Sequence, residues 1–488
     1  MRILFLVNPV FNSEQIGILT LTAMLKQDRH SVSLLSMNGK SSHWLNEKIR
    51  QMEPDIVAYS AMSTEIRGFL QINRILKKKS KRKFKSIFGG PHPTFFPEMI
   101  EEEGVDAICR GEGEIALRQY IGYLNSSVSP DQVGNFLIKD GRRIIRNEIQ
   151  PWIADLDSIP FPDRRIWDDI DEFPIEKCIY TTRGCPYHCG YCFNHAYNEL
   201  YGNPRPVVRR RSLDNVMMEL RQIITAYPDA FVFIHDDSFL HQPVSWLDEF
   251  KSRYKTEIGR PFGCNIRPNQ LSETKARLLA EAGCRHCYFG LECGDEEIAN
   301  RILGRQMTNE QILYASRLLK KYGIRMVTNV INALPVQNPV QVDVKSLDLC
   351  IECRPDFAYA NIFFPFPKTR LERYAVENGF YEKNGIGFPD VLCHYSPLTF
   401  DPETKREVEC QSKLFSLTVA FPILKRWLPL LRKLPFMKLY ILIHLVHGGY
   451  CARFKLFPAV KRIQYIRYLI LLFIKKIKTL KQSGALDG

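Results

Sequence analysis

Acidic residues are missing from one end of this sequence. No Asp or Glu occurs between Gln411 and Leu486, a segment that holds fifteen basic residues. With Asp487 included, residues 411–488 carry +14, which equals the formal net charge of the whole chain, so residues 1–410 sum to zero. The basic character therefore belongs to the tail and says nothing about what the rest of the protein binds.

Long apolar runs are also missing. The longest in the tail are 439–443 and 468–474, whereas a helix that crosses a membrane needs about 18 apolar residues in a row, so no transmembrane helix is predicted. The apolar start, Met1 to Val7, is followed by Asn8-Pro9 and by no small-residue cleavage site. We therefore interpret it as a first strand and not as a secretion signal.

The cysteines are numerous but have no secretory context. Fourteen cysteines without a signal segment indicate a reducing, cytoplasmic compartment and exclude a disulfide framework. Three of them lie close together, because Cys185, Cys189 and Cys192 have the spacing C-x3-C-x2-C. Zinc favours four tetrahedral ligands, and a cubane 4Fe–4S cluster also accepts four thiolates. Three thiolates on one short loop leave one iron open, which is useful only if another molecule binds it.

This stretch, Thr181 to Asn194, resembles the motif of the radical S-adenosylmethionine (radical SAM) family, and Tyr191 matches the family's aromatic residue before the third cysteine. The resemblance implies a 4Fe–4S cluster whose open iron is chelated by the amino and carboxylate groups of S-adenosylmethionine. An external electron donor would reduce the cluster, and cleavage of the sulfonium would release a 5′-deoxyadenosyl radical. Three unrelated buried thiols are the alternative, since free cysteine is a common core residue.

Residues 1–125 alternate short apolar runs with helical stretches, which predicts an α/β fold with a doubly wound, Rossmann-like parallel sheet. Ligands of such sheets bind at the carboxyl ends of the strands. The order of the pieces resembles the cobalamin-binding domain that precedes the radical SAM domain in one large subgroup, particularly at 89–94 and 110–114. The residues expected to contact cobalamin are Ser63, Thr64, Gly89, Gly90, Gly111 and Glu112.

The loop after the first strand departs from many cobalamin proteins. Those proteins carry D-x-H-x-x-G here, with a His that ligates cobalt, whereas this chain has Asn8 to Ser13 with no His. We expect no cobalt ligand from this loop. A Rossmann-like domain without a ligand, serving as a substrate lid, is the alternative.

Residues 126–174 are predicted to form a hairpin that turns at Asp140-Gly141, followed by a proline-punctuated linker. Over 175–385 strand and helix patterns alternate six times, which matches the family's partial (β/α)6 barrel, with the cysteine loop after the first strand. The predicted strands are 178–181, 231–235, 261–264, 286–291, 325–332 and 357–363.

The ends of the later barrel strands carry the other candidates for S-adenosylmethionine. The resemblance assigns the methionyl amino group to Asp236 or Asp237, the methionyl carboxylate to Arg267 and the ribose to Glu292. Each acid also has a purely structural alternative, because either Asp could cap a helix and Glu292 could be an ion-paired strand end. The chain departs from the family at Cys293 (for Ser), within 333–337 and within 365–369.

Two further sets of cysteines lack a full ligand set. Cys284 and Cys287, which lie around a predicted strand, could form an auxiliary cluster with Cys293, and Cys350 and Cys353 lie three apart on a predicted helix. Because no fourth ligand accompanies either set, we interpret both sets as core or surface thiols.

The tail, within the predicted helical region 386–488, mixes large apolar residues with its bases. Such helices fit an anionic membrane surface, so peripheral membrane contact is predicted through 411–486. The same charges attract nucleic acid, but large apolar residues outnumber polar uncharged ones, which favours the membrane. A helical cap on the barrel with a solvated basic face is the alternative.

Together these features predict a radical SAM enzyme that uses cobalamin to methylate a carbon of an apolar small molecule or secondary metabolite. An oxidative cyclase or a rearrangement enzyme of the same architecture is the close alternative. Methylthiolation of transfer RNA is disfavoured, because the sequence has no N-terminal cysteine triad for a second cluster. A non-catalytic iron–sulfur redox or scaffold protein is the alternative from another class, and it would be expected to supply four protein ligands.

Overall fold

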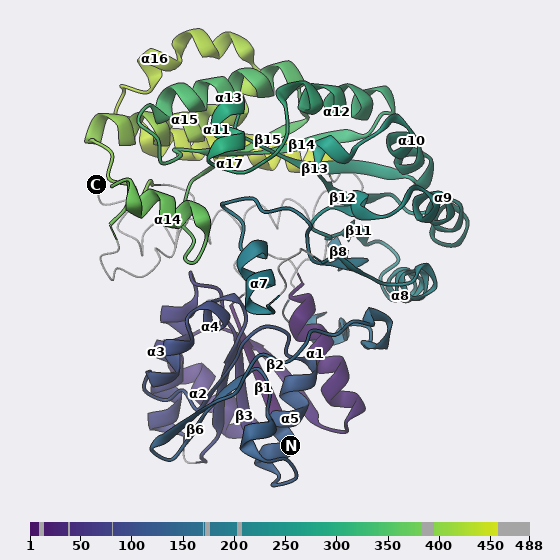
Figure 1. Cartoon of the computed structure of the whole chain (residues 1–488), viewed down its shortest axis with the longest axis vertical. Helices are drawn as coiled ribbons and strands as arrows, with labels where there is room; N and C mark the ends of the chain where they lie inside the picture. Colours follow the sequence, from purple (N-terminus) through teal and green to yellow (C-terminus); the bar gives the residue numbers. More distant parts are fainter. Residues whose placement is uncertain are drawn as a thin grey trace. The chain divides into compact units, whose positions relative to one another are not determined.

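The computed structural model divides into two compact units, and each is described by itself (Figure 1). The structure describes residues 1–8, 14–37, 40–80, 82–168, 170, 176–202, 207–382 and 395–456. Residues up to 170, together with 197–202, belong to the first unit, and the remaining described residues belong to the second.

A seven-stranded sheet with the order β2-β1-β3-β4-β5-β6-β7 forms the first unit. The first five strands pair in parallel, whereas β5, β6 and β7 pair antiparallel. The strand bounds are β1 Arg2–Val7, β2 Ser31–Ser36, β3 Ile56–Ser60, β4 Lys85–Gly89, β5 Ala107–Cys109, β6 Phe136–Asp140 and β7 Arg143–Arg146. The predicted doubly wound parallel sheet is confirmed, and its strand order reverses between β1 and β3, where such folds bind ligands.

Helices cover both faces of this sheet (Figure 1). On one face α1 (Ile16–Gln27) and α5 (Glu114–Leu124) pack over residues such as Phe5 and Ile87. On the other face α2 (Ser42–Met52) and α3 (Ile66–Lys79) pack over residues such as Leu6 and Phe88. The central strands β1, β3 and β4 are buried on both faces, which explains why their sequences are continuous apolar runs and not alternating ones.

The hairpin predicted at Asp140-Gly141 is confirmed, but it belongs to the sheet. β6 pairs with β5 through contacts such as Ile108 with Leu137, so the first unit continues past the expected boundary at residue 125. The loop 9–13, which is notable in the sequence because it lacks a histidine, lies outside the described residues.

A six-stranded parallel sheet with the order β15-β14-β13-β12-β11-β8 organises the second unit and confirms the partial barrel. The strand bounds are β8 Glu176–Ile179, β11 Phe231–Ile234, β12 Phe262–Ile266, β13 Cys284–Glu292, β14 Arg325–Asn332 and β15 Phe357–Ile362. The main helices between and after the strands are α8 Leu213–Ala226, α9 Val244–Arg253, α10 Glu273–Ala282, α11 Glu296–Arg301, α12 Asn309–Lys321, α13 Pro339–Cys353, α14 Arg370–Glu377 and α15 Pro402–Ala420.

Local sequence signals account for several of these helix starts. Thr308 accepts a hydrogen bond from the Gln311 backbone N–H, and the Gln311 side chain accepts from the Thr308 backbone N–H, so the predicted capping box of α12 is confirmed. Ser272 caps α10 by accepting from Lys275 N at 3.3 Å. Each cap satisfies backbone donors that a helix start otherwise leaves unpaired.

The last described helices pack onto the barrel. α17 (Met437–Cys451) contacts α15, which lies on β15, and Cys451 and Leu456 are buried with Val327 and Phe357. This part of the tail therefore has the cap geometry that the sequence left open. Among the described residues, no helix combines the length and the apolar character needed to span a membrane.

Candidate functional site

The three-cysteine loop follows the first barrel strand, as predicted. It lies between β9 (Thr182–Arg183) and α7 (Asn194–Leu200). Gly184 has φ 100°, and a Cβ at this residue would overlap the Val207 carbonyl, so glycine is required at this turn. Gly190 donates its N–H to Leu303 O at 2.8 Å, and its carbonyl accepts from Leu371 N at 2.8 Å. These bonds hold the loop against neighbouring segments of the second unit.

The chemistry of the three thiols fits a metal cluster. Burial raises the pKa of Cys185 to about 11 and that of Cys192 to about 12, although backbone N–H groups of Tyr187 and Asn194 hydrogen-bond them and lower it. Cys189 accepts a hydrogen bond from Arg267 Nη1 at 3.4 Å. Each sulfur thus has at least one N–H donor, but burial of the loop disfavours three thiolates unless a cation is bound. A 4Fe–4S cluster supplies that positive charge.

The Arg267 side chain, which follows β12, packs against the three-cysteine loop. Its guanidinium stacks 3.6 Å from the centre of the Tyr187 ring and donates to the Arg305 carbonyl as well as to Cys189 Sγ. The resemblance assigned this residue to the methionyl carboxylate. That role stays a prediction, and the hydrogen bonds show that Arg267 holds the cysteine loop in place.

Asp236 and Asp237, side by side after β11, have different environments. Asp236 is fully buried and accepts from Thr181 N at 2.6 Å, from the Thr181 hydroxyl and from Thr182 N at 3.1 Å, while burial raises its pKa to about 6. Asp237 is exposed by comparison, accepts from Asn194 Nδ2 at 3.0 Å and raises the pKa of Cys185 and Cys192 through its charge. Asp236 therefore anchors the start of the cysteine loop. Asp237 faces the cysteines, and its carboxylate can accept further hydrogen bonds.

Glu292, at the end of β13, belongs to a buried polar network. The strand register shifts between Gly290 and Glu292, and Glu292 has φ 66°. A Cβ at Gly290 would overlap the Glu292 carboxylate, which explains why this position of the motif is a glycine. Arg305 Nη1 lies 4.0 Å from Glu292 Oε1 and donates to the Tyr191 hydroxyl at 2.9 Å. Burial raises the pKa of Glu292, whereas the Arg305 charge lowers it.

Arg305 is a residue of this site that the sequence did not predict. Its side chain is 6% exposed and touches Tyr191, Glu292 and the Gly290 carbonyl, and it also hydrogen-bonds Cys189. The sequence carried no signal for it, because Gly304-Arg305 belongs to no strand end or motif. The structure brings it to Tyr191 and Glu292 only through the fold of the segment after α11.

The glycine loops predicted to contact cobalamin lie at the carboxyl ends of β4 and β5. Gly90 has φ 93°, and a Cβ there would overlap the Ala61 backbone. Gly111 has φ 77°, donates to Thr94 Oγ1 at 3.1 Å and faces the Tyr201 ring. Protein groups therefore lie against both positions, so these two glycines shape the loops themselves.

The other predicted cobalamin residues lie in the same loops. Glu112 N donates to the Tyr201 hydroxyl at 2.7 Å, and Ile153 N donates to Glu112 Oε2 at 2.9 Å. Ser63 Oγ lies 3.0 Å from His92 Nδ1, and burial lowers the pKa of His92 to about 4. Thr64 and Gly89 lie beside Ser63 and Gly90 along the chain. A neutral imidazole, hydroxyls and backbone groups thus line this end of the sheet.

A Gly111→Ala substitution should disrupt the first unit. A Cβ would clash with Tyr201 and would force a left-handed backbone on alanine, at a cost of about 1–3 kcal/mol. Thermal unfolding and cobalamin content of the purified chain measure this. Gly113→Ala is the matched control, because its Cβ would lie 3.6 Å from Leu21, an ordinary contact. Equal stability and cobalamin content in the two variants would contradict the assignment.

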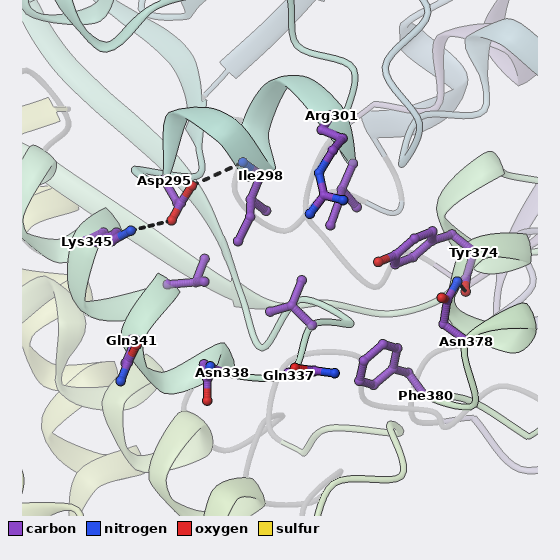
Figure 2. Close-up of a pocket in the computed structure, with 13 residues that line it drawn as sticks. Asp295, Ile298, Arg301, Gln337, Asn338, Gln341, Lys345, Tyr374, Asn378 and Phe380 are labelled. Carbon is purple, nitrogen blue, oxygen red and sulfur yellow. Dashed lines mark hydrogen bonds and ion pairs between the residues drawn. The ribbon is translucent and has the colours of Figure 1, made fainter.

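A cavity of about 440 Å³ lies beside the loop after β14 (Figure 2). Asp295 accepts from Lys345 Nζ at 2.6 Å and from Ile298 N at 3.1 Å at one side, and aromatic rings lie at the other (Figure 2). The lining mixes carboxamides, charges and apolar side chains, and therefore suits a small molecule with polar and aromatic parts. Its residues are Asp295, Ile298, Arg301, Ile302, Val336, Gln337, Asn338, Gln341, Val342, Lys345, Tyr374, Asn378 and Phe380.

Comparisons with known proteins agree with this geometry. The family model described as the B12 binding domain matches residues 4–121, and the Radical SAM superfamily model matches residues 179–344. The chain is a radical SAM protein with an N-terminal B12-binding domain. The predicted fold class and the predicted cofactors, which are a 4Fe–4S cluster, S-adenosylmethionine and cobalamin, are thereby confirmed, and the chain is an enzyme of this class.

Two curated relatives are similar over most of this chain. "Uncharacterized methyltransferase PH0819" of Pyrococcus horikoshii is 26% identical over 74% of this chain and 78% of its own length. "Anaerobic magnesium-protoporphyrin IX monomethyl ester cyclase" of Cereibacter sphaeroides is 25% identical over 67% of this chain, which spans 54% of that relative.

Two solved structures have the same fold at low identity. The cobalamin-dependent S-adenosylmethionine radical enzyme OxsB, with aqua-cobalamin and S-adenosylmethionine bound, has a TM-score of 0.70 at 15% identity and covers 97% of this chain and 75% of its own. The radical S-adenosylmethionine methyltransferase TsrM from Kitasatospora setae, with cobalamin and a 4Fe–4S cluster bound, has a TM-score of 0.61 at 16% identity and covers 79% of each chain.

Proposed function

We propose that this chain is a cobalamin-dependent radical SAM methyltransferase that methylates a carbon atom of a small molecule. The observation that best supports this proposal is a loop with three cysteines at the carboxyl ends of a partial barrel, in a chain that also has a B12-binding domain. Three protein ligands leave one cluster iron for S-adenosylmethionine, whereas an electron-transfer or scaffold cluster would be expected to have four. This difference favours catalysis over the non-catalytic alternative.

Residues of this chain would hold the cluster and its co-substrate. Cys185, Cys189 and Cys192 would ligate three irons, and Arg267 and the segment around Arg305 hold Cys189 in place. When bound, the cluster and S-adenosylmethionine supply a 5′-deoxyadenosyl radical, and cobalamin supplies a methyl group. An external electron donor, not identified by any residue pattern, would reduce the cluster.

The remaining candidates would position S-adenosylmethionine. Asp237 has unpaired carboxylate lone pairs facing the cysteines, which suits an ammonium donor better than the saturated Asp236. Glu292 would accept from the ribose hydroxyls, and the Tyr191–Arg305 pair would keep its carboxylate ionised and fixed. Asp236 acts through the loop and is a positioning residue.

Asp237→Asn should raise the KM for S-adenosylmethionine by about 10- to 100-fold, because a charge-assisted hydrogen bond is worth about 1.5–3 kcal/mol. The rate of 5′-deoxyadenosine formation against S-adenosylmethionine concentration gives this value. Asp236→Asn is the control, since its oxygens are already occupied by Thr181 and Thr182, and it should lower stability with little change in KM. An unchanged KM in Asp237→Asn would remove this residue from the binding site.

An apolar or aromatic substrate is supported by the strand face opposite the helices. Ile179, Val232 and Ile234 pack toward the helices, so the alternating residues face the other side. That side holds Phe233, which lies 4.9 Å from the His235 ring and 5.4 Å from the Tyr288 ring, and Tyr180, 5.9 Å from His235. Rings of this kind bind flat apolar molecules by stacking and edge contacts.

Methylation and cyclisation are distinguished by the fate of the methyl group. Reduced, cobalamin-loaded protein is incubated with S-adenosylmethionine that carries a deuterated methyl group and with a panel of apolar substrates. We expect 5′-deoxyadenosine together with a product, or extracted cobalamin, that has gained the labelled methyl. Cleavage of S-adenosylmethionine with no labelled methyl in the product or in the cobalamin would favour the cyclase alternative. The similarity to the protoporphyrin ester cyclase supports that alternative.

We also propose that the described part of the tail rests on an anionic membrane surface in the cytoplasm. α17 packs onto the barrel through Tyr440 and Ile441, whereas Val446 is 63% exposed on the same helix. Further exposed apolar side chains lie nearby, interleaved with exposed bases at Arg426 and Lys433. The exposed apolar residues are Phe421, Ile423, Trp427, Leu430, Phe436, Leu439, Leu442, Tyr450 and Phe454.

The chain should therefore sediment with phosphatidylglycerol-containing vesicles and not with pure phosphatidylcholine vesicles, because each base near an anionic surface contributes about 1 kcal/mol. Ile423→Glu with Trp427→Glu should lower the bound fraction by about tenfold. Met218→Glu, at an exposed apolar residue of α8, is the control and should bind as the unchanged chain does. Equal binding to neutral vesicles, or no binding, would contradict the proposal.

A further inference from the structure

A second set of three cysteines lies in the barrel away from the cluster loop. Cys264 is on β12, and Cys284 and Cys287 are on the neighbouring strand β13. Their sulfur atoms are 4.0 Å (264–284), 3.7 Å (264–287) and 3.7 Å (284–287) apart. All three belong to the apolar core between the sheet and its helices, and two of them have no exposed surface.

The backbone is irregular at this set. Residues three apart on a regular strand point to opposite faces of the sheet, so Cys284 and Cys287 would be separated. The register between β12 and β13 shifts at Phe262/Gly263, because Phe262 pairs with Cys284 and Gly263 pairs with His286. This bulge places both cysteines on the helix-facing side with Cys264, and bulges commonly re-aim a side chain in this way.

The size of the triangle matches one metal ion. A point equidistant from the three sulfurs lies about 2.2 Å from each, close to the metal–thiolate bond length of about 2.3 Å. Among the residues that the structure describes, the group of potential side-chain ligands at this place consists of these three cysteines alone.

Charge also favours a small, soft cation. Metal binding displaces thiol protons, so the three sulfurs would bind as thiolates inside an apolar core. A buried negative charge without a counter-ion is costly, and a metal ion would offset that cost.

We propose that Cys264, Cys284 and Cys287 form a structural, three-coordinate thiolate site for one soft metal ion, for which Cu(I) is the best match. Zn(II) in structural sites is almost always four-coordinate, whereas this site offers three ligands. Thiolate ligands select soft ions such as Cu(I). The ion would tie β12 to β13 below the loops that carry the cofactors, and it would enter during folding because the site is closed. This site is independent of the proposed methyl transfer.

Metal analysis of the full chain tests the site. The protein is produced with added copper or added zinc, purified anaerobically, and analysed for copper, zinc and iron, and its copper X-ray absorption spectrum is recorded. We expect about one copper per chain in addition to the cluster iron, with three sulfur neighbours at about 2.2–2.3 Å. Cys264→Ala should lower copper by about tenfold or more while the iron content stays unchanged.

Matched variants separate this site from other thiols. The Cys350→Ala variant removes a fully buried cysteine of the same core and should bind as much copper as the unchanged chain. Copper that persists when Cys185, Cys189 and Cys192 are all replaced by Ala excludes the cluster loop as its site. Where Cys264→Ala does not fold, Cys264→Ser, which keeps the side-chain size, provides the same readout. Copper well below one per chain, equal copper in Cys264→Ala, or zinc in place of copper would overturn the proposal.

Discussion

Cys189→Ala should abolish cleavage of S-adenosylmethionine, a loss of about 1,000-fold or more in 5′-deoxyadenosine formation by reduced, reconstituted protein. The substitution removes one of the three thiolates and leaves Arg267, which is 6% exposed, without its sulfur acceptor. Iron content should fall together with activity, because two thiolates on a loop that loses its anchor do not retain a cluster. Iron and sulfide analysis with an activity assay measures both.

Cys350→Ala is the control for loss of a buried thiol in the same unit. Cys350 lies on α13 with no exposed surface and contacts Thr328 Oγ1 at 3.8 Å, away from the three-cysteine loop in the sequence and in its packing. Its cleavage activity should stay within about twofold of the unchanged chain. Unchanged cleavage in Cys189→Ala would refute the assignment of the cluster ligands.

Arg305→Met should destabilise the second unit by about 3–5 kcal/mol, because it leaves a charged carboxylate buried without its partner. The side chains of Arg305 and Glu292 are 6% and 14% exposed, and Arg305 also donates to Tyr191. Methionine fills a similar volume but offers no donor. The midpoint of urea unfolding under anaerobic conditions measures the loss, and cluster retention should fall as well.

Two variants test whether the lost charge pair is the cause. Arg317→Met removes an ion pair with Glu310 whose side chains are 57% and 71% exposed, and should cost at most about 1 kcal/mol. Adding Glu292→Gln to Arg305→Met should recover part of the lost stability, because the uncompensated charge is gone. If Arg305→Met proves no more harmful than Arg317→Met, the buried network does not support the site.

The sequence predicted the architecture well because periodicity reports burial. The runs at β1 and β3 are apolar on both faces, which is the pattern of a covered parallel sheet, and the capping residues Thr308 and Gln311 mark a helix start locally. The three candidate cluster cysteines could also be proposed from the sequence, because their spacing is confined to one loop, and their role as ligands stays a prediction.

The other features of the candidate sites depend on contacts between segments that are far apart in the sequence. The residues around Arg305 in the sequence do not predict its hydrogen bond with Tyr191, which lies 114 residues earlier. Cys264 could not be joined to Cys284 and Cys287 from spacing, since a strand bulge, invisible in the sequence, turns two of the three to a common face. Likewise, the different environments of Asp236 and Asp237 follow from which backbone groups the fold brings to each carboxylate.

The most direct test of the central claim is metal analysis of protein purified anaerobically from cells supplied with cobalamin. A radical SAM methyltransferase of this kind should contain about four irons and one cobalt per chain, with the absorbance of both cofactors. Loss of iron in Cys189→Ala and loss of cobalt in Gly111→Ala should occur separately, because the residues belong to different units. Four irons with no cobalt in the unchanged chain would contradict the dependence on cobalamin, and the absence of iron would contradict the radical chemistry itself.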